Sequence, residues 1–104
     1  NSKVLTRKKL DIDTLIVSKN ICIDYPKNDD TIKCGHYSFR VGSIKPCSTI
    51  QISINGGVWQ NCRQANGYWW FDWFNNNTGD FSVEAKAYIE GKEEKTSKRK
   101  FKVK

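Results

Sequence analysis

The segment 47–74 constrains the fold more than any other part of this sequence, because it alternates apolar and polar side chains. Ile50, Ile52 and Ile54 are separated by single polar residues, which is typical of a strand with one buried face. The Asn-Gly-Gly triplet at 55–57 supplies the positive-φ residues of a tight hairpin turn. Residues 58–64 are therefore predicted to form the return strand of a hairpin.

The two faces of this hairpin can be predicted from its turn. With the loop at Asn55-Gly56, Ile52 lies opposite Trp59; with the loop at Gly56-Gly57, Ile54 does. Cross-strand partners share a face, so either register points Trp59 toward the core and Cys62 toward solvent.

The aromatic segment 67–74 is predicted to be the next strand. Trp69, Phe71 and Trp73 form a wholly apolar face and are the better core candidates. The opposite face carries rings that a buried core does not explain, together with one carboxylate. These residues are the predicted ligand- or partner-binding site: Tyr68, Trp70, Asp72 and Phe74.

The rest of the chain adds strands over 21–25, 31–41, 81–89 and 98–104, with a bulge expected at Gly35. No segment has helical spacing over three turns, so seven or so short strands predict an antiparallel β-sandwich. Residues 1–19 are predicted to be either a linker or an extra edge strand, and residues 20–104 the domain. The predicted core is Ile23, Phe39, Val41, Ile52, Trp59, Trp69, Phe71, Trp73, Val83, Ala85 and Phe101.

Several motifs resemble those of a known family. They are Ile-x-Ile-x-x-Pro at 21–26, Tyr-x-Phe-x-Val at 37–41, Ile-x-Ile-Ser-Ile-Asn-Gly-Gly-x-Trp-Gln at 50–60, Trp-x-Phe-x-Trp at 69–73, Gly-x-Phe-x-Val-x-Ala-x-Ala at 79–87 and Phe-x-Val at 101–103. This order resembles bacterial immunoglobulin-like and fibronectin III-like modules, and the central hairpin also resembles the C-terminal immunoglobulin-like domain of the sulfite oxidase family. The resemblance implies an immunoglobulin-like sandwich over 20–104, but no activity and no functional residue.

The net charge of +7 is concentrated at the two ends of the chain. Residues 1–9 contribute +4 and residues 92–104 contribute +5, whereas the segment between them is slightly acidic. Charged ends are usually solvated, and lysine on an edge strand discourages aggregation. No apolar run approaches the length of a membrane span. Because the sequence starts at Asn1 without a methionine, we expect a piece of a longer protein.

The four cysteines, an even number in a small β domain, suit disulfides in an oxidising compartment. The preferred pairs are Cys22–Cys34 and Cys47–Cys62, with free thiols as the alternative. The first pair requires the bulge at Gly35 to turn Cys34 outward. The spacing lacks the close cysteine pair of a zinc site, so we expect no metal and no cofactor.

Catalytic chemistry has little support in the sequence. His36 is the only histidine, and the acidic pairs at 29–30 and 93–94 lie in a turn and a charged loop. We therefore expect a non-catalytic module of a larger secreted, periplasmic or cell-surface protein, acting as a spacer or contacting a neighbouring domain or protein partner. The alternative is glycan binding by the aromatic face. A third hypothesis, nonspecific binding of polyanions or single-stranded nucleic acid, is the weakest, because the basic residues are segregated from the rings.

Overall fold

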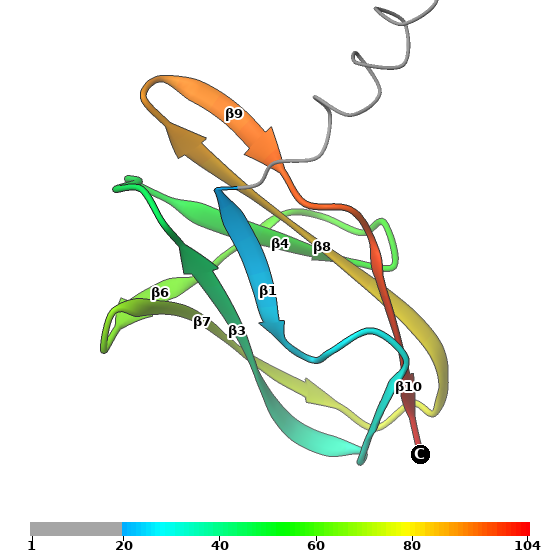
Figure 1. Ribbon diagram of the computed structural model, residues 1–104. Helices are drawn as coiled ribbons and strands as arrows, with labels where there is room; N and C mark the ends of the chain where they lie inside the picture. The colour runs from blue at the N-terminus through cyan, green and yellow to red at the C-terminus, as the bar shows by residue number, and fades with distance from the viewer. Residues whose placement is uncertain (1–19) are drawn as a thin grey trace, which may run out of the picture.

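The computed structural model of the protein describes residues 20–104, which form two β-sheets packed face to face (Figure 1). The predicted linker or edge strand over residues 1–19 lies outside the described residues. The first sheet has the order β1-β3-β7-β6, and its strands are β1 (Ile21–Tyr25), β3 (Gly35–Ser43), β7 (Tyr68–Asn75) and β6 (Arg63–Ala65).

The second sheet has the order β2-β10-β8-β4-β5, with β9 also pairing with β8. Its strands are β2 (Asp30–Ile32), β10 (Arg99–Val103), β8 (Gly79–Ile89), β4 (Ile50–Ile54), β5 (Gln60–Asn61) and β9 (Lys92–Lys95). Apart from the parallel pair β2/β10, neighbouring strands are antiparallel. This arrangement is an immunoglobulin-like sandwich, as the sequence predicted.

The core lies between the inner faces of the two sheets, where the alternation of each strand places its apolar side chains. Phe39 is fully buried at its centre, and its ring meets those of Phe71, Trp73 and Phe101 edge-on at centroid distances of 6.4, 5.4 and 5.8 Å. Phe71 and Trp73 are partly buried and pack against the core cluster. The predicted core is confirmed except for Trp59.

The prediction of a single strand over 31–41 is wrong. The segment is divided between β2, which pairs with β10 in the second sheet, and β3, which pairs with β1 and β7 in the first. Gly35 stands at the start of β3 with a φ of 110°, a conformation that side chains rarely adopt. The glycine therefore marks the point where the chain enters another sheet, rather than a bulge within one strand.

The predicted direction of Trp59 is also wrong. Compared with a regular hairpin closed by a two-residue loop at 55–56, the return segment has one extra residue before it pairs with β4. The turn has positive φ at Asn55 and Gly56, as expected, but Ile52 pairs with Gln60 instead of Trp59. A shift of one residue moves every following side chain to the other face. The Trp59 ring consequently lies outside the second sheet, with the Lys86 Nζ atom 4.4 Å from its centroid.

The same shift turns Cys62 inward, where it is only 9% exposed. The structure does not confirm the predicted disulfides, since all four cysteines at positions 22, 34, 47 and 62 are free thiols. Cys22 pairs with Gly42, at the opposite end of β3 from Cys34, so the first predicted pair is never brought together. The sequence predicted an outward Cys62, but its side chain belongs to the core cluster, against which the partly buried Cys47 packs without forming a disulfide.

No helix in the described part of the chain has the length and hydrophobicity needed to cross a membrane.

Candidate interaction surface

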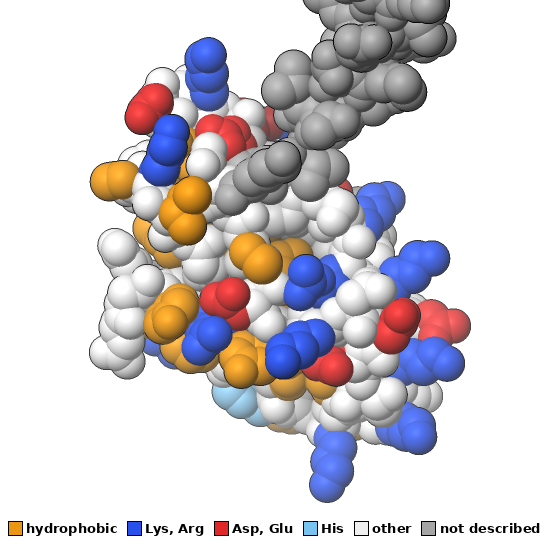
Figure 2. Space-filling view, viewed as in Figure 1, with side chains coloured by type: hydrophobic (Ala, Val, Ile, Leu, Met, Phe, Trp, Pro, Cys, Tyr) orange, Lys and Arg blue, Asp and Glu red, His pale blue; other side chains and the backbone are white. Residues whose placement is uncertain are grey.

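The four residues predicted as a binding site all lie on the outer face of the first sheet, the side away from the second sheet. They alternate along β7 with core residues, so the two-residue period of the strand places them together. Phe74 is 72% exposed and Tyr68 37%, Asp72 is exposed, and Trp70 is half-buried. Figure 2 shows apolar side chains interleaved with basic and acidic ones on this side of the molecule.

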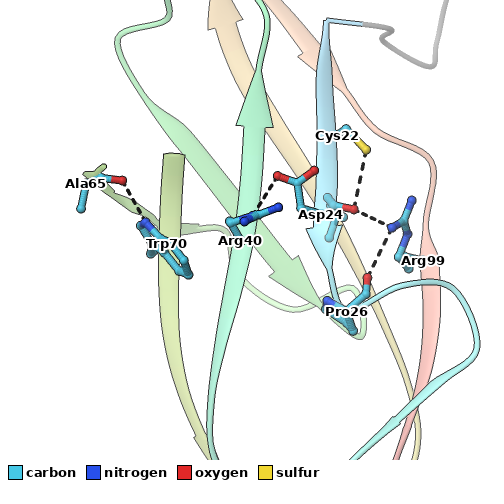
Figure 3. A network of polar contacts seen from close by, with 8 residues as sticks. Cys22, Asp24, Pro26, Arg40, Ala65, Trp70 and Arg99 are labelled. Carbon is cyan, nitrogen blue, oxygen red and sulfur yellow. Dashed lines mark hydrogen bonds and ion pairs between the residues drawn. The ribbon is translucent and has the colours of Figure 1, made fainter. Parts of the chain in front are cut away.

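Arg40, which projects from β3 onto the outer face, contacts two tyrosine rings. Its guanidinium carbon lies 4.2 Å from the Tyr68 ring centroid and 4.7 Å from that of Tyr25. Its Nε atom donates to an Asp24 carboxylate oxygen over 3.1 Å (Figure 3). Cation–π contacts and an ion pair therefore hold this arginine in place, and it occupies one side of both rings.

Trp70 is held at its polar edge. Its indole N–H donates to the backbone carbonyl of Ala65 over 3.0 Å (Figure 3), across the hairpin whose Asn66-Gly67 turn has positive φ at both residues. The Tyr68 ring meets the indole edge-on, with centroids 6.3 Å apart and planes at 78°. The two rings thus do not form one flat aromatic platform.

Asp72 is the polar centre of the outer face. One carboxylate oxygen accepts from the Ser38 hydroxyl over 2.9 Å and lies 3.5 Å from His36 Nε2, and the other accepts from Arg63 Nε over 3.0 Å. The pKa of the Asp72 carboxyl is lowered by the hydrogen bonds from Arg63 and Ser38, with smaller contributions from the charges of Arg63 and His36.

This cluster does not have the geometry of a catalytic triad. A nucleophilic serine requires a hydrogen bond to its base, but Ser38 and His36 both contact Asp72 instead. The side chains of His36 and Asp72 are 60% and 44% exposed, and the Arg63 side chain that contacts Asp72 is 60% exposed. No group of three histidine, cysteine or acidic side chains within residues 20–104 could hold a metal ion.

A depression of about 250 Å³ adjoins Tyr68 between β1 and the turn of the β6/β7 hairpin. It is lined by Asn20, Ile21, Cys22, Asp24, Gly42, Ser43, Ile44, Gly67 and Tyr68. A volume of this size accommodates one or two amino-acid side chains. The outer face therefore offers a small recess beside its row of rings.

The predicted site did not include five residues that contribute to this surface: Tyr25, His36, Ser38, Arg40 and Arg63. The two-residue alternation of residues 36–40 puts His36, Ser38 and Arg40 on a common face of β3, but it does not specify which strand lies beside β3. The observed register sets Ser38 opposite Asp72 and Arg40 opposite Trp70. A correct pairing of β3 with β7 would have predicted the contact of Ser38 with Asp72 and would have placed Arg40 among the outward rings of β7.

No protein-family model matches the sequence, and no curated protein matches it either. Several solved structures resemble the fold, among them the following three. The fibronectin(III)-like modules of Clostridium thermocellum CbhA have a TM-score of 0.64 at 17% identity, covering 80% of this chain and 93% of that one. An endo-beta-1,4-mannanase from Thermotoga petrophila gives 0.67 at 16% identity, covering 86% and 20%. An engineered protein gives 0.69 at 13% identity, covering 81% and 20%.

The chain thus corresponds to nearly the whole of the module structure and to about one fifth of the other two proteins. At these identities the similarity concerns the fold alone. It agrees with the topology of the two sheets: the chain is an immunoglobulin-like, fibronectin III-like β-sandwich.

Proposed function

We propose that the chain is a non-catalytic module of a larger extracytoplasmic protein and that the outer face of its first sheet contacts a neighbouring domain or a protein partner. The structural similarity to fibronectin(III)-like modules supports the role of a module. The proposed location rests on the resemblance to bacterial immunoglobulin-like modules, since the cysteines form no disulfides in the structure. Residues 20–104 would be the folded unit of the parent, and residues 1–19 the linker or edge strand.

The observation that carries this proposal is the arrangement of rings and arginines around Tyr68 and Trp70. Aromatic residues and arginine are enriched at protein interfaces. Phe74 and Tyr68 are exposed large apolar side chains, and Arg40 is already held in place, so it loses little conformational freedom when a partner docks.

The same geometry argues against the glycan alternative. Stacking of a sugar ring requires an open aromatic face, but Arg40 covers one side of both Tyr68 and Tyr25, and Trp70 stands edge-on to Tyr68, which leaves Phe74 as the most exposed ring of the predicted site. Asp72, the carboxylate that would bind sugar hydroxyls, accepts hydrogen bonds from Ser38 and Arg63. These interactions would have to be broken before a glycan could use the surface.

Site-specific photocross-linking tests the proposal. We would replace Tyr68 with the photoreactive residue p-benzoylphenylalanine in the full-length parent protein, irradiate its native host cells and identify the linked peptides by mass spectrometry. We expect cross-links to a neighbouring domain or a second protein. The matched control carries the same group at Tyr88, which is 44% exposed on β8 in the second sheet. Equal labelling at both positions, or none at Tyr68, would refute the outer face as an interface.

The glycan alternative has its own readout. The indole N–H resonance of Trp70 should stay in place when cellohexaose or mannohexaose is added at millimolar concentration, because its ring is held by Ala65 and bordered by Tyr68. A saturable shift of this resonance would instead favour carbohydrate binding.

A further inference from the structure

The first sheet has an incomplete edge beside β7. On one side, β3 pairs with β7 along its whole length, from Val41 opposite Trp69 to Gly35 opposite Asn75. On the other side, the three-residue strand β6 pairs only with residues 68–70. No other described segment continues the ladder, so β7 is open along residues 71–75.

The alternation of an antiparallel ladder identifies the backbone groups at this open edge. Ala65 and Tyr68 flank a two-residue hairpin turn, where the closing pair is hydrogen-bonded, and every second residue of β7 then faces the β6 side. The backbone N–H and C=O groups of Asp72 and Phe74 belong to this set, whereas those of Phe71 and Trp73 point toward β3. Both the N–H and the C=O groups of Asp72 and Phe74 are therefore available to another strand.

The geometry points to a second copy of this chain as the occupant of the open edge, paired through β7 about a two-fold axis at Trp73. In this register Asp72 of each copy lies opposite Phe74 of the other, and each pair exchanges both of its N–H···O=C bonds. Residues 71–75 of the two copies face each other over the whole length that β6 leaves uncovered. The two four-stranded sheets would become one continuous sheet.

Side chains beside the edge suit this pairing. The Phe74 ring is 72% exposed, and no strand lies beside Phe74 on the β6 side of β7. Arg63 lies at the end of β6, in line with the incoming strand, and uses only its Nε atom for Asp72. The Phe74 ring of the second copy would therefore come beside a guanidinium group with free N–H groups, an arrangement that favours a cation–π contact.

The edge also lacks the usual protection against strand pairing. Exposed edges are commonly blocked by lysine, proline or a bulge, none of which occurs within residues 71–75. This inference goes beyond the proposed function, because it concerns the edge of the sheet rather than the Tyr68 end of its outer face. Either can fail without the other.

Analytical ultracentrifugation of the 104-residue chain at about 0.15 M salt, where the repulsion of like charges is screened, tests the inference. A five-residue edge gives a small interface, so we expect dimers at concentrations on the order of 100 µM. A chain that stays monomeric up to about 1 mM would overturn the proposal.

Two pairs of variants show whether the edge is responsible. Asp72→Pro removes an N–H that faces the edge and not β3, so the fold should persist while dimerisation weakens about tenfold or more; Asp72→Ala keeps the N–H and should still dimerise. Phe74→Asn should weaken dimerisation about tenfold, whereas Ile44→Asn, at a residue 78% exposed elsewhere, should not. Equal effects within either pair would refute edge pairing.

Amide hydrogen exchange locates the interface independently. In the dimer, the amides of Asp72 and Phe74 should exchange more slowly than at low concentration, whereas the Trp73 amide should be protected at both concentrations by its bond to β3. If dimers form while the amides of Asp72 and Phe74 remain unprotected, the chain associates through another surface and the proposal is wrong.

Discussion

Trp70 donates its indole N–H to the backbone carbonyl of Ala65, five residues earlier, and the bond closes the hairpin of β6 and β7 from the outside. A half-buried tryptophan whose indole N–H is hydrogen-bonded in this way can lie on the outer face without leaving that polar group unpaired. Its neighbour Trp69 points to the opposite side and is 9% exposed within the core. Adjacent rings on one strand therefore have different structural roles.

Replacing these two tryptophans should give unequal losses of stability. Trp69→Ala removes a buried ring and should lower the free energy of unfolding by about 3–5 kcal/mol. Trp70→Ala removes one hydrogen bond and a half-exposed ring, and should cost only about 1–2 kcal/mol. Chemical denaturation of both variants measures the difference. Equal losses would mean that the outer face is as tightly packed as the core.

The reversed position of Trp59 leads to a second stability prediction. Its ring is covered by the Lys86 and Lys95 side chains, with Nζ atoms 4.4 and 5.7 Å from the centroid, so Trp59→Ala should cost about 1–2 kcal/mol. Ile52→Ala, at a fully buried position on the paired strand, should cost about 2–5 kcal/mol. Thermal melts compare the two, and a larger loss for Trp59 would restore the core position predicted from the sequence.

The strands and most of the core could be predicted from sequence because a strand has a fixed two-residue period. Where that period runs unbroken, as in β7 and β8, every face is predicted correctly. The errors at Trp59 and Cys62 come from one extra residue after a correctly predicted turn. A residue left unpaired in this way cannot be recognised from the alternation of the sequence, but it reverses the faces of the residues that follow.

The residues of the proposed interaction surface were predicted only in part, for a related reason. Alternation along β7 identified Tyr68, Trp70, Asp72 and Phe74, which are close in sequence. Arg40 and Tyr25 reach the same surface through the pairing of β1 and β3 with β7, and a single sequence does not specify which strands become neighbours. Long-range strand order depends on the packing of the whole sandwich.

Asp72 should respond to the loss of its arginine partner. The hydrogen bond from Arg63 is the largest cause of its lowered pKa, so Arg63→Ala should raise this pKa more than Ser38→Ala does. The pKa of Asp72 in each variant can be measured from the NMR signal of its side-chain carboxyl carbon during a pH titration. Because the folded-state pKa is lowered, the associated stability is complete above the pKa of the unfolded chain and is lost as the pH falls through the folded-state value. A larger effect of Ser38→Ala would contradict this ranking.

Cys62 provides a prediction at alkaline pH. Burial raises the pKa of its thiol to about 12, so the folded chain keeps this proton while the unfolded chain releases it near the ordinary thiol pKa. Stability should therefore fall as the pH rises from about 9 toward 12, and Cys62→Val should reduce this fall.

A labelling control complements that measurement. In the folded protein, iodoacetamide should modify the exposed Cys22 well before Cys62. Equal labelling rates at the two cysteines would mean that Cys62 is accessible and that the reason given for its raised pKa is wrong.

The parallel pairing of β2 with β10 has a mechanical consequence. The start of β1 and the C-terminal end of β10 lie at opposite ends of the sandwich (Figure 1). Phe101, Lys102 and Val103 pair in register with Asp30, Thr31 and Ile32, and Arg99 donates to the carbonyls of Ile23 and Pro26 beside them. A force that pulls the two ends apart would load these hydrogen bonds along the strands and all at once, instead of opening them one after another. In a protein under tension, this seam would be a part of the domain that resists extension.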